Sequence, residues 1–493
     1  STANYDTDPD SDTLTVTAIR TGSSEGSGTD GSIGSALTGT YGQLTIAANG
    51  SYTYVANQDA ADALDPGDVV TDTFNYTVSD GQGETDIAVL TITVNGINDA
   101  PVAQNDVGVI VEDGTLTVSN GANANLSGSY DATGEHSGDI IDTSSSSHTD
   151  SDADDSASLT VTAIRVGSSE GSGTAGSIGS ALTGTYGQLT IAADGSYSYV
   201  ANQDAADALD AGDSVTDSFN YTLSDGTATD IGVITITILG ANDAPVANND
   251  TGSVNEDATL TVSSASSGVT QDNDTDVDGD DTVSSLTVTQ IAVTGSSNSS
   301  VTSSTTYSNG TSVTGTYGTL VIGANGTYTY VADQSAADDL DLNDTATDSF
   351  TYTVSDGTAT DTATLIFTVT GINDVPTASD KTISTAEDTP YVFSTSDFGY
   401  TDADDDDALV SVKITTLEDA GALQYNNGSA WVDVTLNQVI TATDIAANKL
   451  RLNPATNENG SSYTTFNFTV NDGDADSATP NTITVNVTAV NDT

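Results

Sequence analysis

The sequence predicts an all-β protein, built from four tandem antiparallel β-sandwich domains in an elongated rod. Three observations support this fold class. Apolar residues fall into short runs that alternate with polar ones, which is typical of half-buried strands. Asn-Gly and Asp-Gly pairs, which favour tight hairpins, separate these runs. A long pattern also recurs along the chain, and repeats of this kind indicate one structural unit used several times.

The repeats define the domain organisation. The segment that starts at Thr13 returns almost unchanged from Ser158, and a looser copy contains the stretch from Val313. Each repeat closes with an aromatic strand, a turn, a β-branched strand and a short linker, as in "FNYTVSDG" followed by "GINDAP". The linker asparagines mark the ends of the repeats. The predicted domains are 1–99, 100–243, 244–374 and a divergent fourth domain, 375–493.

Individual strands follow from the period of two. Tyr197 and Tyr199 share one predicted face, and the serines between and before them share the other. The pairs Asn49-Gly50, Asp194-Gly195 and Asn325-Gly326 are expected to supply the positive φ of hairpin turns. The stretch "AADALDAGD" predicts a single helical turn on a crossover, and no longer helical period is present.

Two domains depart from the pattern. The second carries a polar insertion, 119–149, that holds both histidines, His136 and His148, and we expect these side chains to be solvated. The first lacks an N-terminal strand. With neither an initiator methionine nor an apolar leader, the sequence is typical of an excerpt or a processed product.

The composition is strongly acidic. There are 72 Asp and Glu residues but 6 Lys and Arg, which gives a formal net charge of -66. This balance argues against nucleic acid or an anionic membrane as a partner, because both require clustered cations. Cysteine and methionine are absent, so disulfides and thiol chemistry are excluded and metal sites must use oxygen ligands. No run of apolar residues is long enough to span a membrane.

Several motifs together resemble a known family. "NDAPVANND", "VNEDATLTV", "DNDTDVDGDD", "YGTLVIGANGTYTYV" and "FTYTVSDG" are similar to bacterial cadherin-like tandem repeats of the VCBS type, which form the extenders of giant secreted adhesins of the RTX type. "SVKITTLEDAGAL" and "NKLRLNPA" make the fourth domain similar to a related cadherin-like repeat. The resemblance implies immunoglobulin/cadherin-like sandwiches, Ca²⁺ ions between consecutive domains, export by type I secretion and a ligand-binding module elsewhere in the polypeptide.

The acidic stretch "QDNDTDVDGDD", residues 271–281, favours calcium on chemical grounds as well. Two carboxylates roughly 5 Å apart repel each other by about 3 kcal/mol at an effective dielectric of about 20. Calcium accepts about six to eight oxygen ligands. Asp274, Asp276, Asp278 and Gly279 match the early positions of an EF-hand loop, but Ser285 stands where the closing Glu is needed. The missing oxygens must therefore come from elsewhere.

A topological argument places the acidic loop of the third domain. If the first strand runs from one linker to the other, the loop after it lies beside the following linker, at Asn373 and Asp374. The last hairpin, "SDG" or "NDG", is expected to bring Asp472 of the fourth domain to the same junction. The resemblance adds Glu256 to the cluster, because this residue stands where cadherins keep a calcium-binding Glu in their first strand.

The same argument yields candidate metal ligands at the other linkers. For the second junction they are Glu112, Asp150, Asp152, Asp154, Asn242, Asp243 and Asp356. For the first junction they are Asp6, Asp8, Asp10, Asn98, Asp99 and Asp225. In the fourth domain they are Glu387, Asp402, Asp404, Asn491 and Asp492. The alternative is a merely solvated acidic surface, but the carboxylates recur at equivalent points of each repeat.

The sequence does not favour an enzyme, and we expect neither catalytic residues nor an organic cofactor. "GSSEG" at 22–26 and 167–171 matches G-x-S-x-G, but the first domain has no histidine to act as a base, and a flexible Gly/Ser loop is the simpler interpretation. Paired carboxylates are not placed in an apolar cleft by any motif. Trp431 is the single tryptophan, and one such ring offers little surface on which a sugar could stack.

The sequence therefore predicts a secreted, calcium-rigidified extender or stalk of a bacterial cell-surface adhesin. The alternative is a subunit of an extracellular filament or surface layer made of the same repeats. The expected partners are further repeats, in the same polypeptide or a neighbouring subunit, and a cell-surface or matrix ligand bound elsewhere.

Overall fold

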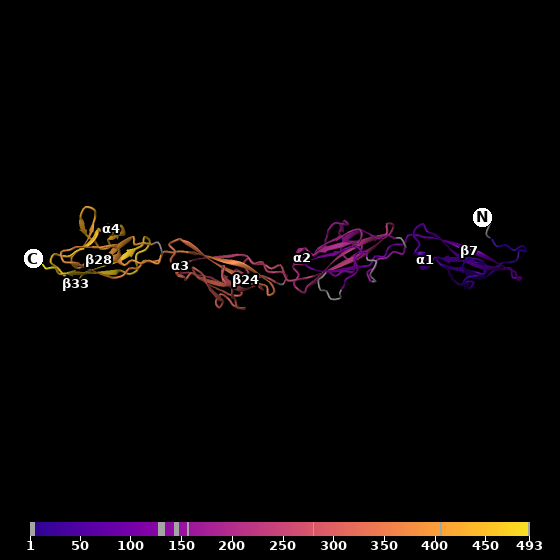
Figure 1. The fold of residues 1–493 in the computed structure, drawn as a ribbon, viewed down its shortest axis with the longest axis horizontal. Coiled ribbons are helices and arrows are strands. Elements are labelled where there is room, and N and C mark those ends of the chain that lie inside the picture. Colours follow the sequence, from indigo (N-terminus) through magenta and orange to yellow (C-terminus); the bar gives the residue numbers. More distant parts are fainter. Residues whose placement is uncertain are drawn as a thin grey trace. The chain divides into compact units, whose positions relative to one another are not determined.

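The computed structural model describes residues 5–126, 134–141, 147–154, 157–279, 281–404 and 407–491. Residues 1–242 and 243–493 form two compact units. The strands of the described residues pair into two sheets for each repeat, and the helices are single turns (Figure 1). The predicted all-β fold is confirmed, while the domain boundaries remain predictions from the sequence.

The first sandwich has two antiparallel sheets, ordered β2-β1-β6-β7 and β3-β4-β5. Its elements are β1 (Thr15–Thr21), β2 (Asp30–Gly31), β3 (Leu37–Thr38), β4 (Gln43–Ile46), β5 (Tyr52–Val55), α1 (Asp59–Asp62), β6 (Val69–Ser79) and β7 (Thr85–Asn95).

The second sandwich has one more strand in each sheet. The orders are β11-β10-β15-β16-β8, in which β8 is parallel to β16, and β12-β13-β14-β9. Its elements are β8 (Asp106–Val111), β9 (Thr115–Val118), β10 (Thr160–Val166), β11 (Ala175–Gly176), β12 (Leu182–Thr183), β13 (Gln188–Ile191), β14 (Tyr197–Val200), α2 (Asp204–Asp207), β15 (Ser214–Ser224) and β16 (Thr229–Leu239).

The third sandwich repeats this plan, with sheets β17-β25-β24-β19-β20 and β18-β23-β22-β21. Its elements are β17 (Asp250–Asn255), β18 (Thr259–Val262), η1 (Ala265–Ser267), β19 (Thr287–Val293), β20 (Ser299–Ser300), β21 (Thr311–Thr314), β22 (Thr319–Ile322), β23 (Tyr328–Val331), α3 (Ser335–Asp338), β24 (Thr345–Ser355) and β25 (Thr360–Thr370).

The fourth sandwich keeps the larger sheet but builds the other from different strands, with orders β26-β34-β33-β28-β31 and β27-β32-β29-β30. Its elements are β26 (Lys381–Ala386), β27 (Tyr391–Val392), η2 (Thr395–Phe398), β28 (Ser411–Thr416), β29 (Ala422–Asn426), β30 (Trp431–Asp433), β31 (Val439–Thr441), α4 (Ala442–Ala446), β32 (Leu450–Asn453), β33 (Gly460–Asn471) and β34 (Asn481–Thr488).

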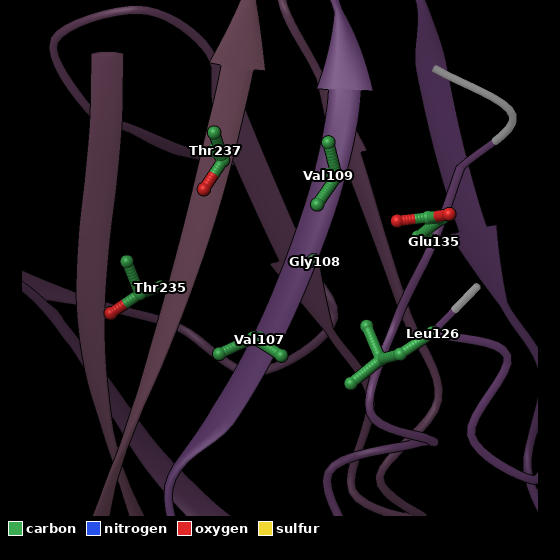
Figure 2. Close-up of a pocket in the computed structure, with 7 residues that line it drawn as sticks. All are labelled: Val107, Gly108, Val109, Leu126, Glu135, Thr235 and Thr237. Carbon is green, nitrogen blue, oxygen red and sulfur yellow. The ribbon is translucent and has the colours of Figure 1, made fainter. Parts of the chain in front are cut away.

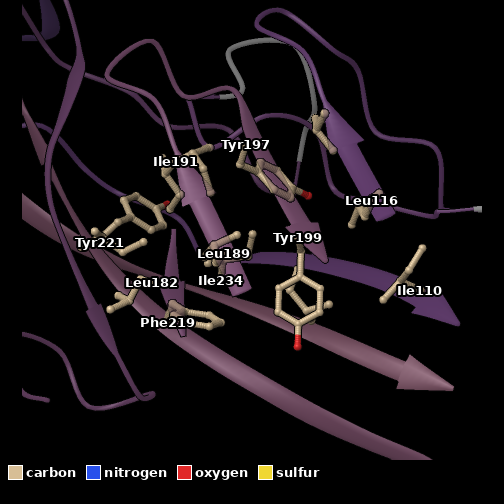
Figure 3. Close-up of a cluster of buried hydrophobic side chains, with 14 of the residues drawn as sticks. Ile110, Leu116, Leu182, Leu189, Ile191, Tyr197, Tyr199, Phe219, Tyr221 and Ile234 are labelled. Atoms are coloured by element: carbon tan, nitrogen blue, oxygen red, sulfur yellow. The ribbon is translucent and has the colours of Figure 1, made fainter. Parts of the chain in front are cut away.

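Alternating side chains form the core of each sandwich, as the period of two predicts. In β14, Tyr197 and Tyr199 are buried, whereas Ser198 between them is half-buried. Tyr199 packs edge-on against Phe219 of the facing sheet, with ring centroids 6.3 Å apart. Figure 3 shows both tyrosines and Phe219 within the cluster, together with Leu116 of β9.

A buried aspartate in the long strand of each of the first three sandwiches fixes the "GTYG" turn of the other sheet. In the second, the Asp217 carboxylate accepts hydrogen bonds from the backbone N–H groups of Thr185, Tyr186 and Gly187 and from the Tyr199 hydroxyl, at 2.8–3.2 Å. Asp72 and Asp348 do the same. No sequence motif distinguishes these three aspartates from the other acidic residues of the strands.

The predicted hairpin turns are confirmed at their glycines. Gly50, Gly195 and Gly326 have φ values of 80°, 86° and 77°, whereas the preceding Asn or Asp does not adopt positive φ. The helical turn predicted on the crossover is also confirmed, as α1, α2 and α3.

The "GSSEG" loops are held by side chains, contrary to the expected flexibility. The Asn75 amide donates to the carbonyl oxygens of Gly22 and Ser27, at 3.1 and 2.9 Å, and accepts from the N–H of Gly26 at 3.1 Å. Asn220 makes the equivalent bonds in the second sandwich. These asparagines therefore give the loop a fixed, structural conformation.

The expectation that His136 is solvated is wrong. Residues 134–138 of the insertion run beside β8, where Val109 donates to Glu135 and Ser137 donates to Val107 through their backbones. This contact buries His136, and Ile140 joins the hydrophobic core. Burial lowers the pKa of His136, although the nearby Asp139 charge opposes the shift. His148 is half-buried against the Asn105 carbonyl.

Candidate metal centres

The first strand of a repeat turns at a glutamate that lies beside the following linker. After β17, Asp257 adopts a φ of 58°, and the Glu256 carboxylate accepts a hydrogen bond from the N–H of Ile372 at 2.6 Å. Glu112 accepts from Ala241, and Glu387 from Val490. The sequence-based placement of Glu256 near Asn373 is therefore confirmed.

The acidic loops lie beside the preceding linkers, so the placement made from the sequence is wrong. Asp154 accepts from the N–H of Asp99 at 3.1 Å, and Asp404 accepts from the N–H of Asp374 at 3.0 Å. Asp278 accepts from the N–H of Asp243 at 3.0 Å. An isolated β-bridge joins each loop to its linker. The bridged pairs are Val102 and Ser151, Val246 and Thr275, and Thr377 and Thr401.

The reason is the path of the chain. In the third sandwich, β17 runs along β25 towards the following linker and reaches Glu256. The chain then reverses and returns as β18 in the other sheet, so that the acidic loop begins after two passes and not after one. Each acidic loop therefore lies beside the linker that precedes it. The Asp99 linker lies beside Asp150, Asp152 and Asp154, the Asp243 linker lies beside Asp274, Asp276 and Asp278, and the Asp374 linker lies beside Asp402 and Asp404.

The first acidic loop is also displaced from its predicted linker. Asp6 accepts a hydrogen bond from the Tyr76 hydroxyl at 2.9 Å, and Asp8 accepts from the N–H of Asp10 at 2.7 Å. Asp6 and Asp8 line a cavity with Asp80 of the last hairpin, rather than meeting Asn98.

The last hairpins meet the linkers as predicted. The Asn98 side chain donates to Asp225 at 2.9 Å, and the Asn373 side chain donates to Asp472 at 3.4 Å. Asp356 occupies the corresponding hairpin of the third sandwich, where carboxylate oxygens of Asp276, Asp281 and Asp356 lie within 4.8 Å of one another.

Six side chains converge at the third linker, and we call them the Asn373 site. They come from the third sandwich, the linker and the fourth sandwich: Glu256, Asn373, Asp374, Asp402, Asp404 and Asp472. Asp407, which the sequence analysis missed, has a carboxylate oxygen within 4.8 Å of those of Asp402 and Asp472.

Several oxygens of the Asn373 site are buried without a hydrogen-bond partner. They are Oε2 of Glu256, Oδ1 of Asn373 and Oδ1 of Asp404. Burial, together with the neighbouring carboxylates, raises the pKa of Glu256 to about 7 and that of Asp404 to about 6. Desolvation likewise raises the pKa of Asp374. Such oxygens are costly to bury unless a cation or a donor meets them.

A similar cluster at the first linker, the Asn98 site, consists of Asn98, Asp99, Asp152, Asp154 and Asp225. Oδ2 of Asp152 and Oδ1 of Asp154 are buried without partners. Desolvation raises the pKa of Asp154. Desolvation acts on Asp225 too, but hydrogen bonds from Asn98, Thr227 and Ala228 outweigh it and lower the pKa of that carboxyl.

Lysine and arginine do not neutralise either site. The ion pairs formed within the described part of the chain are Arg20–Asp30, Lys381–Asp397, Lys413–Asp476 and Lys449–Asp444. Oxygen-only clusters with unpaired, buried atoms match the ligand preference of a hard divalent cation. The residues present at the Asn373 site therefore fit a calcium ion.

The remaining predicted ligands have weaker support from the geometry. Glu387 accepts hydrogen bonds from Val490 and Asn459, and Asn491 is exposed. The hydrogen bonds from Val490 and Asn459 lower the pKa of Glu387. Asp492 lies outside the described residues. Asn242 is the last residue of the first compact unit, and Asp243 is the first residue of the second.

A cavity lies beside the insertion of the second sandwich. It has a volume of about 300 Å³, and Figure 2 shows Leu126 and Glu135 of the insertion next to Val107 and Val109 of β8. Thr235 and Thr237 of β16 complete the lining with Gly108. Glu135 is the one carboxylate that the described residues contribute to this lining.

Comparison with known proteins gives the family. A sequence model described as the bacterial cadherin-like domain matches residues 1–96, 98–240 and 242–371. The chain belongs to this family. Among curated proteins, the cadherin-like chain is similar to the calcium-binding lectin RapA2 of Rhizobium johnstonii, with 31% identity over 209 residues that make up 42% of this chain and 75% of the relative.

Solved cadherin structures are similar to the chain at low identity. The protocadherin gammaB7 EC3-6 structure has 11% identity and a TM-score of 0.41, and the match covers 92% of this chain and 90% of that one. Mouse cadherin-23 EC22-24 has 12% identity and a TM-score of 0.38, with 80% of this chain and all (100%) of that chain covered.

Proposed function

We propose that the chain is a calcium-rigidified segment of extracellular repeats, an extender or stalk of a large bacterial surface adhesin, and that its role is structural and adhesive and not catalytic. The observation that carries this proposal is the Asn373 site. Its carboxylate and amide oxygens, which are the kind that calcium binds, come from two sandwiches and their linker. Three of these oxygens are buried without a hydrogen-bond partner. The name of the similar protein RapA2, a calcium-binding lectin, supports both calcium and adhesion.

Within the Asn373 site, Glu256, Asn373 and Asp404 would hold calcium through their unpaired oxygens. Asp374, Asp402 and Asp472 would supply further carboxylate charge. A bound Ca²⁺ offsets the repulsion among these groups and links residues on both sides of the linker. Hydrogen bonds already orient part of the set, because Ile372 and Asp374 donate to Glu256 and Asp404 through their backbone N–H groups.

The proposed location is outside the cell, at the bacterial surface, with further repeats and a surface or matrix ligand as partners. The net charge of -66 supports a protein that stays in contact with solvent and divalent cations. Among the described residues, no helix is long and apolar enough to cross a bilayer.

Calorimetric titration of the full chain with calcium chloride tests the proposal. We expect saturable binding, and Asp404→Asn should weaken the site to which Asp404 contributes by about tenfold or more. Asp419→Asn is the matched control, because Asp419 is an exposed aspartate of the same sandwich outside the site. Absence of binding to the unchanged chain, or equal binding by both variants, would contradict the proposal.

A further inference from the structure

A polar pocket lies beside the first strand of the third sandwich. Its volume is about 430 Å³, within the range of about 300–1,000 Å³ that small-molecule sites occupy. The polar groups of its lining include Asp250 and Ser253 of β17, Ser267 of η1, Asp272 of the acidic loop, and Tyr328 of β23. Leu260, Val262 and Val269 form an apolar wall.

Two polar groups of this pocket are incompletely paired. The Tyr352 hydroxyl donates to Oδ2 of Asp250 at 2.7 Å, but within the described part of the chain neither Oδ1 of Asp250 nor the Tyr328 hydroxyl forms a hydrogen bond. Tyr328 is 5% exposed. Burial raises the pKa of Tyr328 to about 12, and the charges of Asp250 and Asp272 act in the same direction. A buried hydroxyl therefore lies near two carboxylates and has no partner from the chain.

The second sandwich fills the equivalent place from its own insertion. Asp106 of β8 corresponds to Asp250, because Tyr221 donates to Asp106 as Tyr352 donates to Asp250. Residues of the insertion lie beside β8 (Figure 2), and the Ser137 hydroxyl donates to Oδ1 of Asp106 at 3.0 Å. The carboxylate oxygen that stays open in the third sandwich thus accepts a hydroxyl donor in the second.

The fourth sandwich fills the equivalent place with a cation. Lys381 begins β26 and pairs in parallel with β34, as Asp250 begins β17 and pairs in parallel with β25. Nζ of Lys381 lies 3.3 Å from Oδ1 of Asp397 in η2, and the Tyr391 hydroxyl donates to the same oxygen at 3.2 Å. An ammonium group, a carboxylate and a tyrosine hydroxyl therefore meet there. Residues 244–374 of the third sandwich contain neither lysine nor arginine, so this chain segment cannot supply the ammonium group itself.

We propose that the pocket of the third sandwich binds a protonated amino sugar, with the ammonium group of the sugar between Asp250 and Asp272. The ring hydroxyls would form hydrogen bonds with Ser253, Ser267 and Tyr328, and the C–H face of the ring would pack against the apolar wall. Charge-assisted hydrogen bonds to the two carboxylates supply the strongest contacts. The site is separate from the Asn373 site and requires no metal, so the inference goes beyond the function proposed above.

Other classes of ligand match the pocket less well. A neutral sugar would leave the two carboxylates without a counter-charge. An alkylammonium ion without hydroxyl groups would leave the hydroxyls of Ser253, Ser267 and Tyr328 unpaired, at a cost in binding free energy. A lone divalent cation would leave the apolar wall and most of the volume unused.

Saturation-transfer NMR of the full chain with glucosamine tests this inference. The measurement is made at pH 7 in about 0.15 M salt, which screens non-specific attraction to the acidic surface. A calcium chelator is present throughout, so that failure of the calcium proposal leaves the test intact. We expect saturable binding of glucosamine, and binding of glucose and of butylamine that is weaker by about tenfold or more, because each lacks one of the two kinds of donor.

Variants of the full chain locate the binding. Asp250→Asn and Asp272→Asn should each weaken glucosamine binding by about tenfold or more. Asp250→Lys places the residue of the fourth sandwich in the pocket and should abolish binding. Asp339→Asn is the matched control and should bind as the unchanged chain does, because Asp339 is an exposed aspartate of the same sandwich outside the pocket. Asp272 is also exposed, so its replacement tests the pocket without disturbing the core.

Three results would overturn the inference. The first is the absence of saturable glucosamine binding to the unchanged chain. The second is binding of glucose or butylamine that is as tight as that of glucosamine. The third is equal binding by Asp272→Asn and Asp339→Asn, which would place any bound amine on the general acidic surface and not in the pocket.

Discussion

At the scale of single residues, the junctions concentrate acidic groups where the protein offers them too few donors. Each of Glu256 and Asp404 has one oxygen bonded to a linker N–H and the other buried without a partner. A solvated acidic surface would turn these oxygens towards water. The burial therefore favours a bound cation over mere surface charge.

The raised pKa values give a prediction for the calcium-free protein. In the folded state the pKa of Glu256 is about 7, above the value of 4.5 for an unperturbed Glu. The protonated form is thus favoured by folding, and this stabilisation is present below pH 4.5 and is lost as the pH rises through 7. In a chelator, we expect the third linker to be protected from hydrogen exchange at pH 5 and less protected at pH 7.5, after correction for intrinsic rates.

Calcium should reverse this trend, because it binds the ionised carboxylates. Glu256→Gln is the control: it removes the Glu256 titration and should reduce the pH dependence to the part that Asp404, with its pKa of about 6, contributes. If the unchanged protein shows the same protection at both pH values, the carboxyl groups are not desolvated as described.

Asp217 offers a test that does not involve metal. Asp217→Ala leaves three backbone N–H groups and the Tyr199 hydroxyl without their acceptor, which should destabilise the second sandwich by about 2–4 kcal/mol. Asp217→Asn keeps one acceptor oxygen and should cost less. Hydrogen exchange at Thr185, Tyr186 and Gly187 reports the loss locally, and equal exchange in both variants and the parent would refute the role of Asp217.

Residues found by the sequence analysis and residues it missed differ in the signal they carry. Asp225 and Asp472 were found at their linkers because the hairpin motif recurs at the end of every repeat. Asp407 was missed because a run of aspartates does not indicate which carboxylates turn inwards. Asp72, Asp217 and Asp348 were missed because a carboxylate that accepts four hydrogen bonds within a core resembles any other acidic residue on a strand.

At the scale of elements, the path of the first strand decides which linker each acidic loop meets. The sequence pattern identified the strands and the loops, but not the reversal at Glu256 that sends β18 back along the sandwich. This reversal depends on Asp257, which adopts positive φ, and on pairing with β23 in the other sheet. Neither property is visible in the alternation of apolar residues.

This path predicts opposite results for two matched double variants. Asp402→Asn with Asp404→Asn should abolish the calcium-dependent protection of residues 372–375, because both carboxylates belong to the Asn373 site. Asp276→Asn with Asp278→Asn should leave that protection intact, because those residues lie beside Asp243. Hydrogen exchange with and without calcium measures both. The reverse outcome would mean that the chain reaches the acidic loop after one pass along the sandwich, so that this loop lies beside the following linker.

The insertion of the second sandwich predicts a separate pH effect. Burial lowers the pKa of His136 below the usual value of 6.5, so folding favours the neutral ring. Stability of the 134–141 segment is then present above pH 6.5 and falls as the pH drops and the unfolded segment gains a proton. Hydrogen exchange at Val109 and Ser137 should therefore show less protection at pH 5 than at pH 7.5. His136→Gln should remove this difference, and its persistence would exclude His136 as the cause.

At the scale of the whole molecule, the proposed calcium ions would couple neighbouring sandwiches. Each sandwich has its own buried apolar cluster, so removal of calcium should leave the cores intact. The linker residues, in contrast, carry mostly like charges, and their repulsion should increase once the cation is removed.

The most direct test is small-angle X-ray scattering from the full chain with saturating calcium and after chelation, with circular dichroism to check that the strands persist. We predict that chelation broadens the distribution of interatomic distances and leaves the β signal unchanged. Asp402→Asn with Asp404→Asn should produce part of this broadening even in calcium. A scattering profile that is identical with calcium and with chelator, from a protein that elemental analysis shows to be free of calcium in both, would contradict the account.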